Sequence, residues 1–384
     1  MTGVTQMKAT FNALFNHAPT GHVSAPGRVN LIGEFTDYNE GFVLPTAINF
    51  RTQVLYSARR DDKVCVYSTN YPNEVDEFSL SDEITVGDCQ WGNYIRAVVY
   101  VLKRAGYKVG GLNLLIESDV PQGAGLSSSA ALEVSTIGAF NQAFSLAINE
   151  KDIALLGQQA ENDFMDCQCG IMDQLISAKA EQGNALLIDC QQLATTAISI
   201  PEDLSIVIVN SNYPRKLVDS EYNQRRLDCE NAASKMQVDS LRKADMAMLE
   251  QHKGTFTENE YKRAHHVISE NERVVQATQA LRNNDMSLLI ELMAASHQSL
   301  HQDFEVTVPA THGLVTIISQ ALENRGAVRM TGGGFGGAVV CLCRANDVEV
   351  IKQAIEATYH KEFGLMADIY VCQADTGLTY HQLV

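Results

Sequence analysis

Three glycine-containing segments concentrate the residues that could do chemistry. The first covers residues 25–39 (APGRVNLIGEFTDYN) and holds Arg28, Glu34 and Asp37 with little apolar periodicity. Charged groups in such a stretch are costly to bury without partners, so the segment is either a solvated loop or a polar binding site. A sugar needs several fixed donors and acceptors of this kind. Composition alone leaves both interpretations open.

The second segment covers residues 121–131 (PQGAGLSSSAA). Gly123 and Gly125 allow backbone N–H groups to approach a ligand closely, and three serines then open a helix. Free N–H groups at a positive helix end can hold a phosphate, whereas the simpler alternative is a capped helix after a glycine turn. We favour phosphate binding, although no Lys-Ser/Thr follows the glycines as in a Walker P-loop, and the His-Arg-Asp signature of protein kinases is absent.

The third segment, residues 330–337 (MTGGGFGG), matches the dinucleotide fingerprint G-x-G-x-x-G. That fingerprint must open a helix, but the residues that follow, AVVCLC, predict a strand, which argues against an NAD-dependent dehydrogenase. We expect a glycine-lined hairpin that brings backbone amides close to a ligand. A flexible hairpin with no ligand is the alternative.

Two carboxylates lie between these segments. Glu161 is expected at the end of an amphipathic helix that starts near residue 152, and Asp173 in the first turn of a short helix. A carboxylate in a first turn is often only a partner of the helix dipole, so a catalytic role for Asp173 is a hypothesis at this point.

The elements that must position these residues can be outlined from periodicity. A helix begins near residue 127, seven-residue spacing predicts a long helix around residues 267–281, and a last helix covers about residues 347–360. Strands are expected at residues 53–57, 64–68, 112–118, 185–188, 206–209, 327–330, 338–343 and 368–372. Periodicity lapses over residues 189–203, where we place a domain boundary. The pattern predicts α+β structure.

Composition limits the partners. The chain has 384 residues and a formal net charge of -17, so nucleic acid and acidic membranes are poor partners, and an anionic substrate would need a locally reversed field. The nine cysteines lack a framework spacing, and no signal peptide or membrane span is evident, which predicts a cytoplasmic protein with reduced thiols. The pairs Cys167/Cys169 and Cys341/Cys343 are expected to be small core residues rather than zinc ligands.

Taken together, the three segments resemble the GHMP kinases over nearly the whole chain. PQGAGLSSSA is similar to the phosphate-binding motif of that family, while GRVNLIGEFTDYN, GIMDQLIS and VRMTGGGFGG resemble segments of its galactokinase members. The resemblance implies a two-domain α+β fold with mixed and antiparallel sheets and an active site in the interdomain cleft. It implies an N-terminal domain of residues 1–195 and a ferredoxin-like C-terminal domain of residues 196–384. A monomer is expected.

The resemblance also implies a reaction, the phosphorylation of the anomeric hydroxyl of galactose by ATP, and a role for each matching residue. Asp173 would be the catalytic base with Arg28 beside it, and Ser129 and Glu161 would hold Mg²⁺. Galactose would be bound by Glu34, Phe35, Thr36, Asp37, Gly170, Asp173 and Tyr222. ATP would be bound by Gly123, Ala124, Gly125, Leu126, Ser127, Ser128, Ser129, Gly333 and Gly334, with Ser68 and Trp91 as candidates near the adenine.

One residue departs from the pattern. The resembling signature usually has histidine where this chain has Phe35, and phenylalanine can neither donate nor accept a hydrogen bond, so contacts around the sugar's hydroxymethyl group are open. N-acetylgalactosamine as substrate and a non-catalytic sensor of sugar and ATP stay as alternatives; the intact Glu34 and Asp37 argue against mevalonate. His265 and His266 are expected on a solvated helix face.

Overall fold

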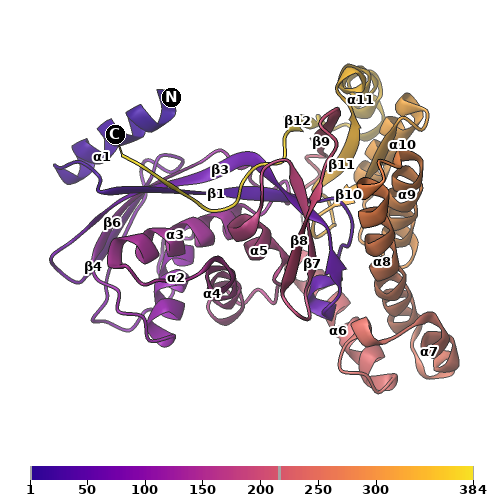
Figure 1. Ribbon diagram of the computed structural model, residues 1–384, viewed down its shortest axis with the longest axis horizontal. Helices are drawn as coiled ribbons and strands as arrows, with labels where there is room; N and C mark the ends of the chain where they lie inside the picture. Colours follow the sequence, from indigo (N-terminus) through magenta and orange to yellow (C-terminus); the bar gives the residue numbers. More distant parts are fainter. Residues whose placement is uncertain (1, 215–217, 384) are drawn as a thin grey trace.

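The computed structural model describes residues 2–214 and 218–383, which form three β-sheets covered by helices (Figure 1). The helices are α1 (Thr2–Phe15), α2 (Gly92–Arg104), α3 (Ser128–Phe144), α4 (Glu150–Asp163), α5 (Met172–Lys179), α6 (Val218–Lys235), α7 (Met246–Gln251), α8 (Glu258–Arg282), α9 (Met286–Gln302), α10 (Pro309–Leu322) and α11 (Val348–Phe363). The strands are β1 (Gly21–Asn30), β2 (Phe42–Val43), β3 (Pro45–Ala58), β4 (Lys63–Ser68), β5 (Val75–Ser79), β6 (Leu112–Ser118), β7 (Asn184–Asp189), β8 (Ala194–Ser199), β9 (Leu204–Asn210), β10 (Gly326–Thr331), β11 (Ala338–Arg344), β12 (Asp368–Cys372) and β13 (Thr379–His381).

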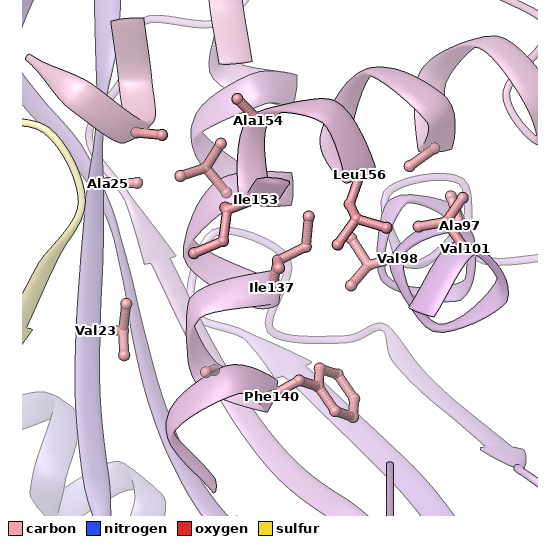
Figure 2. Packing of buried hydrophobic residues seen from close by; sticks show 14 of the residues in the cluster. Val23, Ala25, Ala97, Val98, Val101, Ile137, Phe140, Ile153, Ala154 and Leu156 are labelled. Carbon is pink, nitrogen blue, oxygen red and sulfur yellow. The ribbon is translucent and has the colours of Figure 1, made fainter. Parts of the chain in front are cut away.

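The largest sheet has the strand order β13-β1-β3-β6-β4-β5 and is mixed, because β4 and β6 run parallel while the other pairs are antiparallel. Helices α2 to α5 cover one of its faces (Figure 1). Their apolar residues, including Val98 of α2, Ile137 of α3 and Ile153 of α4, meet Val23 and Ala25 of β1 in one core (Figure 2). Helix α3 is buried on nearly all sides over residues 130–140, which fixes the helix that begins at the predicted phosphate loop.

Strand β1 is buried along its whole length, and its pairing with β3 is irregular. The register shifts between Pro26 and Arg28, where the sequence Pro-Gly replaces ordinary strand residues. Proline offers no N–H to the ladder, and a Cβ on Gly27 would lie 2.6 Å from the carbonyl oxygen of Leu126. Between the pairs that Pro26 and Arg28 form with β3, one residue of β1 lies opposite three residues of β3, so the extra residues of this irregularity belong to β3, directly opposite the stretch that leads to Arg28.

The second sheet, β10-β11-β9-β12, is entirely antiparallel. Val207 and Val209 of β9 face a core shared with α6, α8, α10 and α11, whereas Ile206 and Ile208 face a core shared with β1 and α9. Both faces are therefore buried, which explains why β9 reads as a continuous apolar run. Since the second of these cores also contains Val29 of β1, it joins the two sheets into one packed body.

A third, small sheet (β2-β7-β8) and the end of the chain complicate a simple division of the molecule. Strand β8 lies in the stretch where periodicity lapses, where no strand was predicted, and the predicted boundary at residue 195 falls inside it. The C-terminal strand β13 returns to pair with β1. The bounds of the two domains therefore stay a prediction.

All nine cysteines are free thiols. Cys341 and Cys343 are buried in β11, as expected, but Cys167 and Cys169 are only partly buried. Among the described helices, none has the length and apolar content needed to cross a membrane.

Candidate active site

An ion pair between Arg28 and Asp173 lies at the centre of the site. Arg28 Nε donates to Asp173 Oδ1 and its NH2 group donates to Oδ2, each over 2.7 Å, which is a bidentate geometry. The Ser127 hydroxyl also donates to Asp173 Oδ2 over 2.5 Å, and the remaining Arg28 NH1 group donates to the Gly125 carbonyl over 2.7 Å. Each Arg28 side-chain nitrogen therefore has a partner within the protein, and both residues line a cavity to which the Asp173 side chain keeps 31% of its surface exposed.

The cavity is lined by residues from distant parts of the chain. They are Arg28, Glu34, Phe35, Asp37, Tyr94, Ser129, Glu161, Asp166, Cys167, Cys169, Gly170, Met172, Asp173, Gln174, Tyr222, Asn223, Gly332 and Gly333. The structure therefore brings together most of the residues that the sequence singled out for a sugar, a cation and the chemistry.

The negative charge of the cavity changes the protonation of its walls. Burial alone would lower the pKa of Arg28, but the charges of Asp173 and Glu34 raise it above its ordinary value. Burial, followed by the charge of Asp173, raises the pKa of Asp37 to about 6. A ligand that gives Asp37 hydrogen-bond donors, as sugar hydroxyls do, would favour its charged form.

Glu34 and Thr36 both shape the sugar segment, but only Glu34 lines the cavity. Glu34 Oε1 accepts hydrogen bonds from the Gly332 N–H over 2.8 Å and from the Thr331 hydroxyl over 3.1 Å, which joins the 25–39 segment to the glycine hairpin. Thr36 is fully buried outside the lining, and its hydroxyl donates to the carbonyls of Gly33 and Phe42. It shapes the loop backbone.

Gly170 lies directly against Asp37. A Cβ at this position would lie 2.0 Å from Asp37 Oδ2, so only glycine leaves the carboxylate where it is. The two residues come from segments 133 positions apart in the chain, and their contact brings the loop after α4 onto the 25–39 segment.

An aromatic cluster forms another wall. The Phe35 ring stacks on Phe304 at 4.5 Å between centroids and lies 5.9 Å from the Tyr222 ring. Tyr38 completes the cluster at 5.6 Å from Tyr222. Because Phe304 is fully buried, the stack is anchored in the core beneath α6 and α8.

The predicted phosphate loop leads directly into α3. Gly123 and Gly125 have φ angles of +72° and +74°, which glycine adopts without strain, and Ser127 precedes the helix with φ +60°. Ala124 and Leu126 are buried in the core and anchor the loop. The first-turn residues Ser128 and Ser129 are partly exposed. A helix N-terminus with unpaired N–H groups is suited to anions.

The glycine hairpin has the predicted shape. Strands β10 and β11 pair antiparallel up to Thr331 and Ala338, and residues 332–337 form the turn. Gly332 and Gly333 line the cavity, but Gly334 does not: it packs on Val306, where a Cβ would lie 2.6 Å from the carbonyl oxygen. Since a strand follows the glycines, the dinucleotide interpretation fails.

Several carboxylates converge where the predicted cation would lie. Glu161 and Ser129 line the cavity, and behind them Glu133 is fully buried, with Oε1 unpartnered and Oε2 accepting from Gln174 Nε2 over 3.1 Å. Burial, followed by the charge of Glu161, raises the pKa of Glu133 well above its ordinary value. A cation beside Glu161 would balance this excess negative charge.

Within the described part of the chain, no three His, Cys, Asp or Glu side chains are grouped to hold a metal unaided. The donors that are present fit Mg²⁺, which is usually bound by one or two protein ligands together with phosphate oxygens and water. Ser129 and Glu161 are a donor set of this type.

A second cavity adjoins the first and shares Tyr94 and Ser129 with it. Ser68 and Trp91, the two candidates near an adenine, both line it. The indole of Trp91 is nearly parallel to the Tyr71 ring, at 8° and 6.0 Å between centroids. Flat aromatic walls of this kind suit a planar base.

Comparisons with known proteins agree with this geometry. The profile of the galactokinase galactose-binding signature matches residues 9–58, that of the GHMP kinases N terminal domain matches residues 93–181, and that of the GHMP kinases C terminal region matches residues 277–361. The structure of Lactococcus lactis galactokinase complexed with galactose is 34% identical, covers 98% of this chain and 99% of its own, and has a TM-score of 0.93. The chain belongs to the galactokinase family of GHMP kinases.

More distant kinases share the fold of this galactokinase-family chain. Methanococcus jannaschii mevalonate kinase is 16% identical over 92% of this chain and 98% of its own, with a TM-score of 0.65. Streptococcus pneumoniae phosphomevalonate kinase is 13% identical over 91% and 99%, with a TM-score of 0.62. These matches confirm the α+β GHMP-kinase fold, and at such identities they indicate the fold alone.

Two sequence interpretations of this galactokinase-family chain need correction. Cys167 and Cys169 line the cavity instead of filling a core. His266 is fully buried: its Nε2 lies 3.1 Å from the Glu34 carbonyl, which can only accept, so Nε2 carries a hydrogen and His266 supports the sugar segment. Its partner is 232 positions away, so local polarity could not reveal this.

Sequence reasoning also missed Glu133, Tyr71 and the hydrogen bond from Ser127 to Asp173. Glu133 follows Ser129 by four residues, which places both on one face of α3, so helical spacing could have identified it. Tyr71 lies in a loop without periodicity, and no sequence signal points to it.

Proposed function

We propose that this galactokinase-family chain transfers the γ-phosphate of ATP to the anomeric hydroxyl of galactose, giving galactose 1-phosphate and ADP. The observation that carries the proposal is the exposed Asp173 carboxylate, fixed by Arg28 and Ser127 between the sugar segment and the phosphate loop. A base in this position can reach a hydroxyl that faces a phosphate at the start of α3.

Galactose would lie in the first cavity, with Glu34, Asp37 and Tyr222 around it and C1 towards Asp173. Asp173 accepts the proton of the C1 hydroxyl as that oxygen bonds to the γ-phosphorus and the bond to ADP breaks. Arg28 orients the carboxylate through both of its oxygens. Direct in-line transfer of this kind depends mostly on positioning and on stabilising spread negative charge.

The ATP phosphates would lie on the glycine-serine loop, between Gly123 and Ser129, with Gly333 of the hairpin on the other side. Ser129 belongs to both cavities, so a nucleotide there reaches from the sugar towards Trp91. The N–H groups and positive end of α3 would hold the phosphates in a protein whose net charge is -17.

We propose that Ser129 and Glu161 hold Mg²⁺ together with the phosphates of ATP. A bound Mg²⁺ neutralises part of the phosphate charge that develops during transfer. Glu161 is 7% exposed and faces the cavity, which suits a ligand that is approached from one side.

The first experiment measures ADP release with Mg-ATP and a panel of galactose, glucose, N-acetylgalactosamine and mevalonate. We expect turnover on galactose, and a loss of at least about 10³-fold in kcat for Asp173→Asn, because the amide cannot accept the proton. Asp163→Asn, at an exposed aspartate paired with Arg104, is the control and should leave kcat unchanged.

Three other outcomes would contradict parts of the proposal. Preferred turnover of N-acetylgalactosamine would change the substrate. Tight binding of galactose and ATP without turnover would place the chain among sensors. A phosphorylated Asp173 trapped during turnover would replace direct transfer by a two-step route.

A further inference from the structure

The sugar cavity contains an apolar patch among charged groups. Phe35 stands between Glu34 and Asp37 in sequence and lines the same cavity, but its side chain has no hydrogen-bonding atom. The carboxylate of Glu34 is bonded to the hairpin at Thr331 and Gly332. A hydroxyl of the ligand that faces Phe35 therefore meets an aromatic ring at this point of the wall.

The Phe35 ring is held in place. Its backbone has φ +66°, a left-handed conformation that bulky residues rarely adopt, and its ring stacks on Phe304 at 4.5 Å. Phe304 is fixed in turn: Arg225 Nε donates to the Phe304 carbonyl over 2.8 Å, and its NH2 group donates to the Glu305 carbonyl over 3.1 Å. Strained backbone that is locked from several sides is typical of ligand-binding walls.

Phe35 and Asp173 belong to different walls of the cavity. Asp173 is bonded to Arg28 and Ser127, beside the phosphate loop. Phe35 belongs to the core beneath α6, α8 and α10. If C1 of the sugar faces Asp173, the carbons that are distant from C1 in a pyranose, namely C3, C4 and C6, are the ones that can face Phe35.

We propose that Phe35, supported by Phe304, determines the specificity of the sugar site: its ring receives one carbon of the sugar whose hydroxyl the protein does not bind. The enzyme then accepts the galactose analogue that is deoxygenated at that carbon and discriminates against loss of the other hydroxyls. This inference rests on the proposed function and deepens it by naming the acceptable substrates.

The physical reason is the difference between a bound and an unbound hydroxyl. A site built to hydrogen-bond a hydroxyl discriminates against the deoxy analogue in kcat/KM, by as much as about 10⁴-fold. The reason is that its own polar groups are then left unpaired. An apolar wall has no group to leave unpaired, so removal of the hydroxyl beside it lowers kcat/KM by no more than about threefold and can raise it, because that hydroxyl no longer has to be desolvated.

The experiment measures kcat/KM for galactose and for its 2-deoxy, 3-deoxy, 4-deoxy and 6-deoxy analogues. For the unaltered protein we expect one of the last three analogues to lose no more than about threefold in kcat/KM relative to galactose, or to exceed it, while the others fall by at least about 30-fold. In Phe35→His, which supplies a donor and acceptor, the ratio of galactose to the tolerated analogue should rise at least about tenfold, and the other ratios should not change.

Two control variants separate chemistry from packing. Phe35→Leu keeps the wall apolar and should keep the unaltered protein's pattern of ratios. Phe50→Leu removes a ring that pairs with Tyr370 away from the cavity, and should change no ratio. If Phe35→His does not fold, Phe35→Asn replaces it, since asparagine tolerates a positive φ.

Phe304 is a positioning residue in this scheme and has its own test. Phe304→Ala should raise the KM for galactose several-fold and reduce the differences in kcat/KM among the analogues, with kcat nearly unchanged. Phe304→Leu should restore the KM and these differences. Equal penalties for all four analogues in the unaltered protein, or unchanged ratios in Phe35→His, would overturn the proposal.

Calorimetric titration of the same sugars gives the corresponding ratios of dissociation constants, which do not depend on turnover. If no sugar is phosphorylated but the binding ratios follow the expected pattern, the proposed function fails and the role of Phe35 stands. If galactose is phosphorylated but all the deoxy analogues carry the same penalty, the proposed role of Phe35 fails while the proposed function stands.

Discussion

Asp37 illustrates at the scale of one residue how a site is kept at the expense of stability. Its pKa is raised to about 6 by burial and by Asp173, whereas an unfolded chain gives it an ordinary value of 3.8. A raised folded-state pKa contributes stability at low pH, and this contribution is lost as the pH rises through about 6. At neutral pH, the ligand-free protein therefore carries a destabilising charge at this position.

Asp37→Asn should stabilise the ligand-free protein at pH 7.5 by about 1–3 kcal/mol, and the gain should vanish towards pH 4 as Asp37 becomes protonated. Galactose affinity should fall at least about tenfold, because a charged acceptor is lost. Thermal unfolding at both pH values and calorimetric titration check this. A Tm gain that is equal at both pH values would contradict the electrostatic explanation.

Gly170→Ala tests the contact between the two segments that meet at Asp37. The new methyl group would start 2.0 Å from Asp37 Oδ2, so the carboxylate or the loop has to move. We expect the KM for galactose to rise at least about tenfold, since small displacements of positioning groups are costly. Gly254→Ala, at a glycine with open space around it, is the control. An unchanged KM would place Asp37 outside the sugar contacts.

At the scale of the element, the glycine hairpin depends on Gly334 for two reasons. Its φ of +74° favours glycine, and a Cβ would press on Val306 at 2.6 Å. Gly334→Ala should lower the free energy of unfolding by about 1–3 kcal/mol. Gly364→Ala has a similar φ of +68° but open space, so it measures the backbone strain alone. Equal losses in urea unfolding of the two variants would mean that the Val306 contact is irrelevant.

A comparison of the predicted and observed strands shows which parts of the structure can be predicted from the sequence. Strands β6 and β12 were predicted with the observed bounds, because each is a short run bounded by clear turn signals. Strand β8 was missed because it is half exposed at the margin of a small sheet and lacks an apolar run. The glycine, serine and acidic segments pointed to residues most of which line one cavity. The supports of Phe35 could not be predicted, since Phe304 and Arg225 are distant in sequence.

At the scale of the whole molecule, buried and half-buried histidines contribute to the response to acid. Burial lowers the pKa of His266 to about 4, of His297 to about 3 and of His381 to about 4, against an ordinary value of 6.5. Between pH 6.5 and 4 the unfolded chain therefore binds protons at these sites that the folded protein does not. The free energy of unfolding therefore decreases as the pH falls from 6.5 to 4.

We expect this loss to outweigh the opposite contribution of the carboxylates with raised pKa values, because five histidines with lowered pKa values oppose three such carboxylates. Each uncompensated proton contributes about 1.4 kcal/mol per pH unit, so urea midpoints should decrease clearly from pH 6.5 to 5. His297→Gln should flatten the pH profile. A midpoint that is constant over this range would show that these histidines titrate alike in both states.

The hydrogen bond between Glu34 and the Gly332 N–H joins residues 298 positions apart. During translation at about 5–20 residues per second, Arg28, Glu34 and Asp37 are made about 15–60 s before Gly333, and until then the cavity lacks one side. A chain that stops before the glycine hairpin thus carries the whole galactose-binding signature but lacks the two glycines that line one side of the cavity. We therefore expect galactose to stabilise the finished enzyme more than its nascent chain.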